Sequence, residues 1–212
     1  MSTSSDYFIG VDLGQKRDYT AVAIVERNGD YLYLRHQEQL KLNTSYKAVA
    51  DRIQQLHRMT SFHGPATLVV DATGVGLCVL DDLESRGLNP IGITITSGRA
   101  ISTTGKRSWV PKRELVVRLV TDFQSGRLEI ASGIPYAEKL IKELLGFRVQ
   151  INRRTGKESF GAESATHDDF VLALALACWG AQPEGNLLTR SGSVLGPGSN
   201  HRIPQPGSSR NG

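Results

Sequence analysis

The stretch FIGVDLGQKRDYT, residues 8–20, ends a short run of apolar and small residues on an acidic side chain, Asp12. The run predicts a buried strand, and the glycine and charged residues after it predict a turn. A carboxylate buried by itself is costly unless a cation or hydrogen-bond donors compensate it. The rest of the sequence must therefore supply a partner for Asp12.

A second stretch, TLVVDATGVG at residues 67–76, repeats this arrangement, because an apolar strand ends on Asp71 and glycines follow. Either aspartate alone is equally well explained as an ordinary turn residue. If the two strands are neighbours in one sheet, their carboxylates converge, and like charges that close favour a cation between them. Carboxylate oxygens suit Mg²⁺ or Mn²⁺. We therefore interpret Asp12 and Asp71 as catalytic metal ligands.

A third acidic motif, THDDF at residues 166–170, opens the last apolar segment. Thr166 and Asp169 resemble a capping box with Asp in place of Glu, so a purely structural role at a helix N-terminus is the alternative. The helix that follows is apolar nearly all round, which predicts that it is buried. We interpret Asp168 and Asp169 as further catalytic metal ligands and favour Asp169 as the direct one, although the sequence leaves that choice open.

Two other polar residues lie beside these motifs. Asp18 either supports the metal ligands from behind or is a turn residue paired with Lys16 or Arg17. His167 is most simply a helix-terminus residue, and orientation of water is its alternative role. Acids around two divalent ions are a recurrent design for phosphodiester hydrolysis, in which one ion helps to deprotonate the attacking water and the other stabilises the leaving 3′ oxygen.

Basic residues in two segments fit a nucleic-acid partner. The net charge of +4 and the pI near 9.2 permit such a partner without requiring one. We predict that the following residues contact DNA phosphates without reading base sequence: Lys106, Arg107, Lys112, Arg113, Arg153, Arg154 and Lys157. The alternative for each segment is an ordinary solvated loop.

The order of elements predicts an α/β fold with a mixed central sheet, an antiparallel meander followed by parallel strands, flanked by helices. Asn28-Gly29 predicts a hairpin turn in the meander, and Thr44 is the expected N-cap of the first helix. Residues 97–110 are rich in Ser, Thr and Gly and predict a mobile loop. We also expect strands at 7–12, 20–26, 31–40, 66–71, 90–96 and 127–131, helices at 45–59, 74–87, 111–126, 135–147 and 166–181, and a hairpin at 148–163.

Composition divides the chain into two parts. Residues 1–183 suit one domain with a substantial core, whereas residues 184–212 are rich in Gly, Ser and Pro and predict a disordered tail. The two cysteines lie in apolar segments, which is typical of buried thiols and not of a disulfide framework. No signal peptide and no apolar run long enough for a bilayer are evident, so we expect a soluble, intracellular protein without a membrane partner.

Together, FIGVDLGQKRDYTAVAIVE, LVVDATGVG and HDDFVLALALA resemble the nuclease domain of tailed-bacteriophage terminase large subunits over about residues 7–181. The resemblance implies an RNase H-like (RuvC-like) fold and a metal-dependent endonuclease that cuts concatemeric viral DNA during genome packaging in the cytoplasm of the infected bacterial host. It implies double-stranded DNA, a packaging ATPase domain, the small terminase subunit and the portal protein as partners. Asp12, Asp71 and Asp168–Asp169 match the metal-binding acids, and Asp18 matches an accessory acid.

The chain has no G-x-x-x-x-G-K-[ST] loop, so we expect either an excised domain or a separately encoded nuclease.

Three other functions stay open at this point. DLGQKRDYT and DATGVG also resemble the phosphate loops of one lobe of an actin/Hsp70-like ATPase, which Mg-ATP binding would reveal. A Holliday-junction resolvase would prefer branched DNA. A non-catalytic DNA-binding or assembly module would bind DNA without cutting it.

Overall fold

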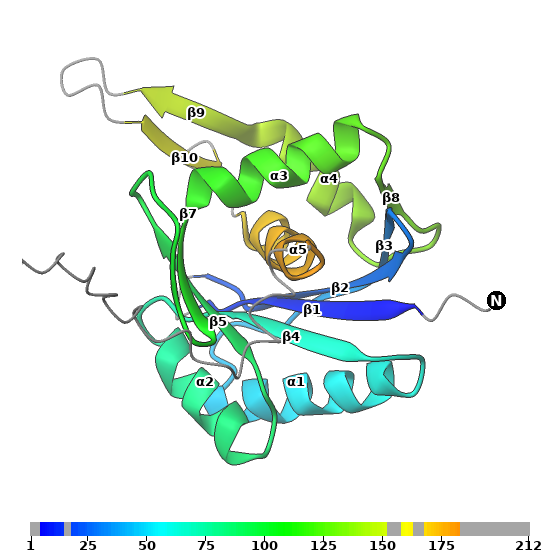
Figure 1. Ribbon diagram of the computed structural model, residues 1–212, viewed down its shortest axis with the longest axis vertical. Coiled ribbons are helices and arrows are strands. Elements are labelled where there is room, and N and C mark those ends of the chain that lie inside the picture. Colours follow the sequence, from blue (N-terminus) through cyan, green and yellow to red (C-terminus); the bar gives the residue numbers. More distant parts are fainter. Residues whose placement is uncertain (1–4, 15–17, 152–157, 163–167, 183–212) are drawn as a thin grey trace, which may run out of the picture.

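The computed structural model describes residues 5–14, 18–151, 158–162 and 168–182. Its centre is an eight-stranded mixed sheet with two helices on one face and three on the other (Figure 1). This arrangement confirms the predicted α/β architecture. The predicted tail, residues 184–212, lies outside the described residues. None of the described helices combines the length and the apolar character that crossing a membrane requires.

The meander forms one half of the sheet, as predicted. β1 (Asp6–Asp12) pairs antiparallel with β2 (Ala21–Asn28), which pairs antiparallel with β3 (Tyr31–Gln39). The turn between β2 and β3 contains Gly29 at φ 59°, a left-handed conformation that glycine adopts without strain. At the outer edge of β3 lies the short strand β8 (Leu128–Ile130), in parallel pairing.

Parallel strands form the other half of the sheet. β4 (Ala66–Asp71) pairs with β1 on one side and with β5 (Ile91–Thr96) on the other, and both pairings are parallel. With β6 (Ser102–Thr104) and β7 (Arg107–Pro111) at one edge, the strand order is β6-β7-β5-β4-β1-β2-β3-β8. Because β1 and β4 are adjacent and parallel, their carboxyl ends lie at the same end of the sheet.

The predicted mobile loop at residues 97–110 is wrong in its second half. There β6 (Ser102–Thr104) and β7 (Arg107–Pro111) form an antiparallel hairpin, and β7 extends the sheet in parallel beside β5. The alternation that defines β7 is present in the sequence, since Ser108 and Val110 are buried and Trp109 between them is exposed. A polar residue in a buried position concealed this pattern. The hydroxyl of Ser108 is satisfied by Thr103 Oγ1 at 3.0 Å.

Two helices cover one face of the sheet. α1 (Tyr46–Ser61) buries Val49, Ile53 and Leu56, which is the face expected from the sequence, and α2 (Gly76–Ser85) packs beside it (Figure 1). The predicted N-cap was one residue early, because Ser45 Oγ accepts the N–H of Ala48 at 3.3 Å. Thr44 Oγ1 instead donates to a backbone carbonyl oxygen in the preceding turn.

The opposite face carries α3 (Lys112–Gln124), α4 (Ala137–Gly146) and α5 (Asp169–Gly180). Figure 1 shows α5 between the sheet and the other two helices. The hairpin of β9 (Phe147–Ile151) and β10 (Glu158–Ala162) precedes α5, as predicted. Every residue of α5 is buried, in agreement with its uniformly apolar sequence.

Close contact between α5 and β1 depends on Gly10. A Cβ atom at this position would lie 2.0 Å from the carbonyl oxygen of Ala173 and 3.0 Å from the Cβ of Ala177. The absence of a side chain at residue 10 therefore lets the helix lie directly on the strand. This packing fixes the N-terminus of α5 relative to the end of β1 that carries Asp12.

Candidate functional site

Asp12 and Asp71 lie side by side at the carboxyl ends of two neighbouring strands. The register pairs Val11 with Val70, so the two aspartates occupy equivalent next positions. Their exposed fractions are 7% and 9%. Asp71 Oδ1 accepts the backbone N–H of Thr73 at 2.8 Å, which orients this carboxylate. The adjacency that the sequence interpretation required is therefore present.

The N-terminus of α5 adds two more acids to this end of the sheet. Asp169 is only 4% exposed, and its Oδ2 lies 3.4 Å from Nε2 of Gln39, the last residue of β3. Asp168 precedes the helix as its N-cap residue, but within the described part of the chain its side chain makes no capping hydrogen bond. Thr166, the other residue of the predicted capping box, lies outside the described residues.

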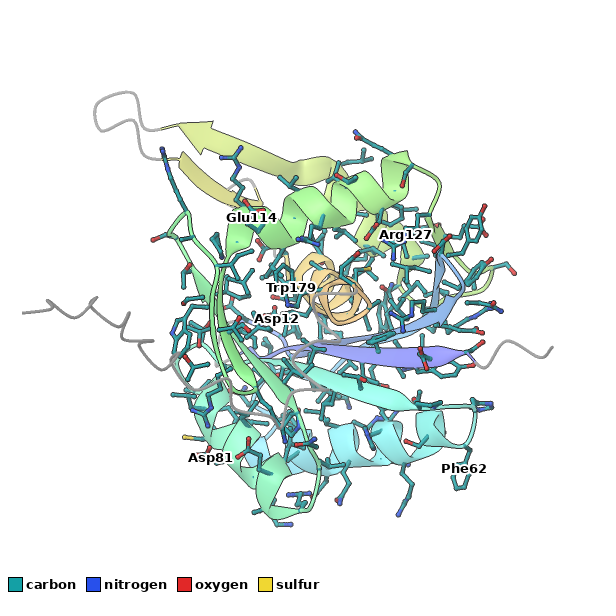
Figure 2. All side chains as sticks on the ribbon, viewed as in Figure 1. Asp12, Phe62, Asp81, Glu114, Arg127 and Trp179 are labelled. Atoms are coloured by element: carbon teal, nitrogen blue, oxygen red, sulfur yellow. The ribbon has the colours of Figure 1, made fainter. Side chains whose placement is uncertain are left out.

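The four carboxylates act on one another electrostatically. Burial raises the pKa of Asp12 well above its ordinary value, and the charges of Asp71, Asp169 and Asp168 raise it further. Burial also raises the pKa of Asp71, although hydrogen bonds from Thr73 and with Asp12 and the charge of Lys112 oppose this rise. Asp12 lies beside α5 in the view of Figure 2. This end of the sheet is therefore a crowded group of acids that favours protons or cations.

Lys112 is a cation of the protein within this group. It begins α3, and its Nζ lies 2.6 Å from Asp168 Oδ2, with both side chains partly buried. Its charge lowers the pKa of Asp12 and of Asp71, in opposition to the carboxylates. Among the described residues that act on Asp12, the four carboxyl groups of this site outnumber the ammonium group of Lys112, and an acidic excess is the electrostatic condition for binding a divalent ion.

The ligands are not preassembled. Among the residues that the structure describes, no three His, Cys, Asp or Glu side chains stand in an arrangement that could already hold a metal ion. Local donors explain this, since Asp71 is held by Thr73, Asp168 by Lys112 and Asp169 by Gln39. The donor chemistry fits Mg²⁺ or Mn²⁺, and the carboxylates must move closer together for three of them to share an ion.

The profile of the family "Terminase RNaseH-like domain" matches residues 9–179. The chain belongs to this family. Similar proteins include the terminase large subunits of Thermus virus P23-45 and Thermus phage G20c, each 23% identical over 171 residues. These matches cover 81% of this chain and 31% of each relative, so the chain spans about a third of the length of the curated relatives it matches.

Solved terminase structures share the fold. The large terminase nuclease from thermophilic phage G20c is 21% identical with a TM-score of 0.59, covering 84% of this chain and 82% of that one. The crystal structure of the same nuclease with bound magnesium is 22% identical with a TM-score of 0.60, covering 82% of this chain and 80% of that one. The large terminase from the thermophilic bacteriophage D6E is 9% identical with a TM-score of 0.61, covering 83% of this chain and 39% of that one. The RNase H-like fold is thereby confirmed.

Asp18 is the acid predicted to support the metal ligands. It is exposed and lines a hollow of about 330 Å³ together with Gly14, Thr20 and the loop between β3 and α1. The structure places it across the turn that follows β1, and its predicted accessory role stays a prediction. His167 lies outside the described residues.

Among the described residues, the predicted DNA-contacting side chains do not form one cluster. Lys106 hydrogen-bonds to Asn89, and Arg107 Nη2 lies 3.4 Å from Asp81 on α2, which covers the face opposite α5. Lys112 instead contacts Asp168 on the α5 side, and the adjacent Arg113 is exposed. Three others, Arg153, Arg154 and Lys157, lie outside the described residues.

Sequence reasoning missed two polar residues that support the site. Gln39 contacts Asp169, and Glu143 of α4 accepts backbone N–H groups from the first turn of α5. Burial raises the pKa of Glu143 to about 7, although N–H donors and Lys139 oppose the rise. One signal was available, because Glu143 shares the helical face of the buried Leu140, and a carboxylate on an apolar face needs an explanation.

Proposed function

We propose that this domain is a divalent-metal-dependent endodeoxyribonuclease that cuts concatemeric viral DNA during genome packaging, in the cytoplasm of the infected bacterial host. The observation that carries the proposal is the group of buried carboxylates of Asp12, Asp71 and Asp169, in which burial and mutual repulsion raise the pKa of Asp12. Such a group costs stability without a cation. Membership of the terminase family supports hydrolysis of DNA as the reaction.

Asp12, Asp71 and Asp169 are the proposed direct ligands, and Asp168 either binds an ion or orients water. Their oxygen donors match the preference of Mg²⁺ and Mn²⁺, and a related terminase nuclease has been crystallised with magnesium and with zinc. When bound, a pair of such ions activates the attacking water and stabilises the leaving 3′ oxygen. We propose two ions by analogy with this general design.

The chain's own residues hold these carboxylates in place. The N–H of Thr73 orients Asp71, and Gln39 contacts Asp169 from the end of β3. Lys112 holds Asp168 and partly neutralises the group while no divalent ion is bound. We propose that Lys112 and its exposed neighbour Arg113 would also contact DNA phosphates at the same end of the sheet.

Further DNA contacts and protein partners rest on weaker ground. We propose that Lys106 and Arg107 meet DNA on the α2 side, and that Arg153, Arg154 and Lys157 meet it from the segment between β9 and β10. A packaging ATPase domain, the small terminase subunit and the portal protein are the proposed partners, by resemblance to complete terminases. The family match disfavours one sequence alternative, the ATPase lobe.

Cleavage of supercoiled plasmid DNA in Mn²⁺ tests the proposal. The wild-type domain should nick or linearise the plasmid with little sequence preference, and Asp12→Ala and Asp71→Ala should each remove this activity while circular dichroism shows a folded protein. Asp51→Ala, which removes a half-exposed carboxylate on α1, is the matched control and should cut like the wild type. Normal cutting by both site variants would refute the proposal. A strong preference for four-way junctions would instead indicate a resolvase.

A further inference from the structure

The first turn of α5 has backbone N–H groups that need acceptors from outside the helix. Normally the N-cap side chain accepts the N–H of the second or third helical residue, and aspartate is among the residues best suited to this task. Asp168 occupies the N-cap position, yet its Oδ2 contacts Lys112, and its side chain makes no capping bond among the described residues. Another group must therefore accept these N–H groups.

Glu143 of α4 provides that acceptor. Its Oε2 accepts the N–H of Phe170 at 3.0 Å and the N–H of Val171 at 3.3 Å, which are the second and third residues of α5. The side chain is 3% exposed, and its Oε1 has no hydrogen-bond partner in the described part of the chain. A buried carboxylate with both contacts on one helix end is positioned as a capping group, and the partial positive charge of the helix N-terminus stabilises it there.

A second residue of α4 reaches the same turn. Lys139 lies one helical turn before Glu143, and its Nζ donates to Gln39 Oε1 at 2.9 Å while lying 5.1 Å from the ring centroid of Phe170. Gln39 in turn contacts the carboxylate of Asp169. α4 therefore holds the backbone of the first turn through Glu143 and contacts Asp169 indirectly through Lys139.

We propose that Glu143 caps α5 in place of Asp168, and thereby leaves the carboxylates of Asp168 and Asp169 available to bind a divalent ion. Glu143 is a positioning residue, since it reaches the site only through the backbone of α5. Without it, Asp168 becomes the nearest suitable acceptor, and its side chain turns toward its own helix and away from Asp12. The inference rests on the proposed metal site, and it names the residue that keeps that site open.

A matched pair of variants separates the capping role from general packing. Glu143→Gln keeps an acceptor oxygen and the side-chain size, whereas Glu143→Met keeps the size and removes the acceptor. Asp122→Asn is the control, because Asp122 is another buried acid that contacts the opposite end of α5 through Gln182. Binding of Mn²⁺ is measured without DNA, by calorimetry and by the electron paramagnetic resonance of free Mn²⁺.

Glu143→Met should weaken Mn²⁺ binding by about 10-fold to 100-fold, the usual range when support for a ligand is lost. Glu143→Gln should bind close to wild type, and Asp122→Asn should bind Mn²⁺ with wild-type affinity. The amide proton resonances of Phe170 and Val171 should move in Glu143→Met, with or without metal. Wild-type affinity in a folded Glu143→Met protein would overturn the inference while leaving the metal site intact.

Two further outcomes are decisive. The first is that the wild type binds no Mn²⁺, or binds Mn²⁺ just as well after the Asp12→Asn substitution. In that case the proposed function fails, and the inference fails with it. The second is that Glu143→Met does not fold, and then the stabilities of Asp168→Ala and Lys112→Gln are compared instead. Both substitutions remove the ion pair between residues 112 and 168, but only Asp168→Ala also removes the side chain that could cap α5. Asp168→Ala should be no less stable than Lys112→Gln in metal-free buffer. A clearly lower melting temperature for Asp168→Ala would show that Asp168 caps α5, and would overturn the inference.

Discussion

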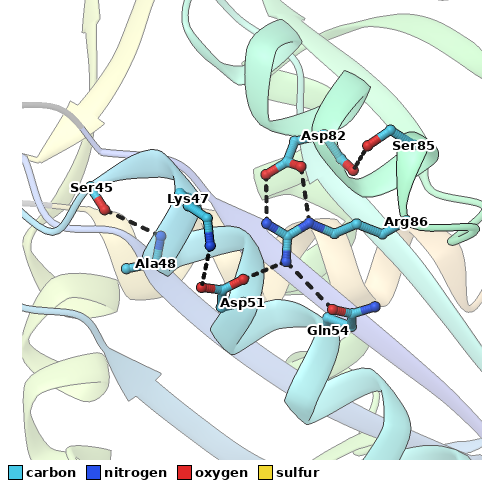
Figure 3. Close-up of polar contacts among 8 residues, drawn as sticks. All are labelled: Ser45, Lys47, Ala48, Asp51, Gln54, Asp82, Ser85 and Arg86. Carbon is cyan, nitrogen blue, oxygen red and sulfur yellow. Dashed lines mark hydrogen bonds and ion pairs between the residues drawn. The ribbon is translucent and has the colours of Figure 1, made fainter.

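Carboxylates on the α1–α2 surface and carboxylates at the carboxyl ends of β1 and β4 have opposite surroundings. On the α1–α2 surface, Arg86 lies between two acids, with Nη1 at 2.6 Å from Asp51 Oδ1 and Nη2 at 2.8 Å from Asp82 Oδ2 (Figure 3). The hydrogen bond from Arg86 lowers the pKa of Asp51. At the carboxyl ends of β1 and β4, burial and neighbouring acids raise the pKa of Asp12 instead.

The difference shows what each arrangement requires. A paired surface acid is satisfied by the protein itself and contributes modestly to stability. The buried acids have Lys112 as a partly buried counter-charge, and their mutual repulsion remains. The paired acids on the α1–α2 surface need no further partner. The crowded acids at the end of the sheet are not explained by folding alone, and a bound cation explains them.

The substitution with the largest expected effect on stability is Gly10→Ala, which would push α5 away from β1 and separate the crowded acids. Gly10→Ala places a methyl group against the backbone of Ala173, which cannot rotate away, and overpacking of this kind should cost about 3 kcal/mol of unfolding free energy. Urea unfolding measures the loss. Gly98→Ala is the control, because its Cβ would meet only Thr96 Oγ1 at an ordinary 3.5 Å, and it should be nearly neutral. Equal stability of the two variants would mean that α5 does not rest on β1 as described.

A paired acid beside α1 gives the next largest effect. Burial alone would raise the pKa of Glu38, but hydrogen bonds and charge from Arg52 and His36 lower it to about 2. A depressed pKa adds stability above the unfolded value near 4.5, and that stability is lost as pH falls toward 2.

Glu38→Gln should therefore lose about 2 kcal/mol at pH 7, after allowance for solvent at the partly exposed Arg52. The difference from wild type should shrink as pH falls through the window from 4.5 to 2. Denaturant titrations across this range provide the measurement. A loss that is the same at every pH would show that packing, and not the charge, accounts for it.

The smallest expected effect has the opposite sign. A carboxylate with a raised pKa destabilises the folded state once pH rises above its unfolded pKa, because the folded state holds the proton more tightly. At pH 7 with EDTA, Asp12→Asn should therefore be more stable than wild type.

Mn²⁺ should reverse this ranking, since it stabilises only the protein that binds it. Thermal melts with EDTA and with Mn²⁺ give both comparisons. A variant less stable than wild type in EDTA would contradict the repulsion described for the acid group, whatever its activity.

Much of this arrangement could be predicted from the sequence, because it depends on patterns within short segments. Apolar runs that end on Asp12 and Asp71 predicted two strands, and the uniformly apolar segment after Asp169 predicted a buried helix. Parallel pairing then brought the acids together. Short-range signals also gave the Asn28-Gly29 turn, which the structure confirms.

The remaining features depend on contacts between distant segments. Lys112 meets Asp168 across 56 positions of sequence, and Glu143 meets Phe170 across 27. Neither contact produces a periodic pattern in the sequence, so Lys112 was predicted only to contact DNA and no role was predicted for Glu143. The strand β7 was missed for another reason, since Ser108 occupies a buried position that an apolar pattern would not include.

A crystal structure of the domain soaked in Mn²⁺, with anomalous diffraction to locate the ion, tests the central claim most directly. We expect an ion bound jointly by Asp12, Asp71 and Asp169, with their carboxylates closer together than they are without metal. Four acids that keep their metal-free contacts, with Asp168 still on Lys112 and no ion between them at saturating Mn²⁺, would contradict it.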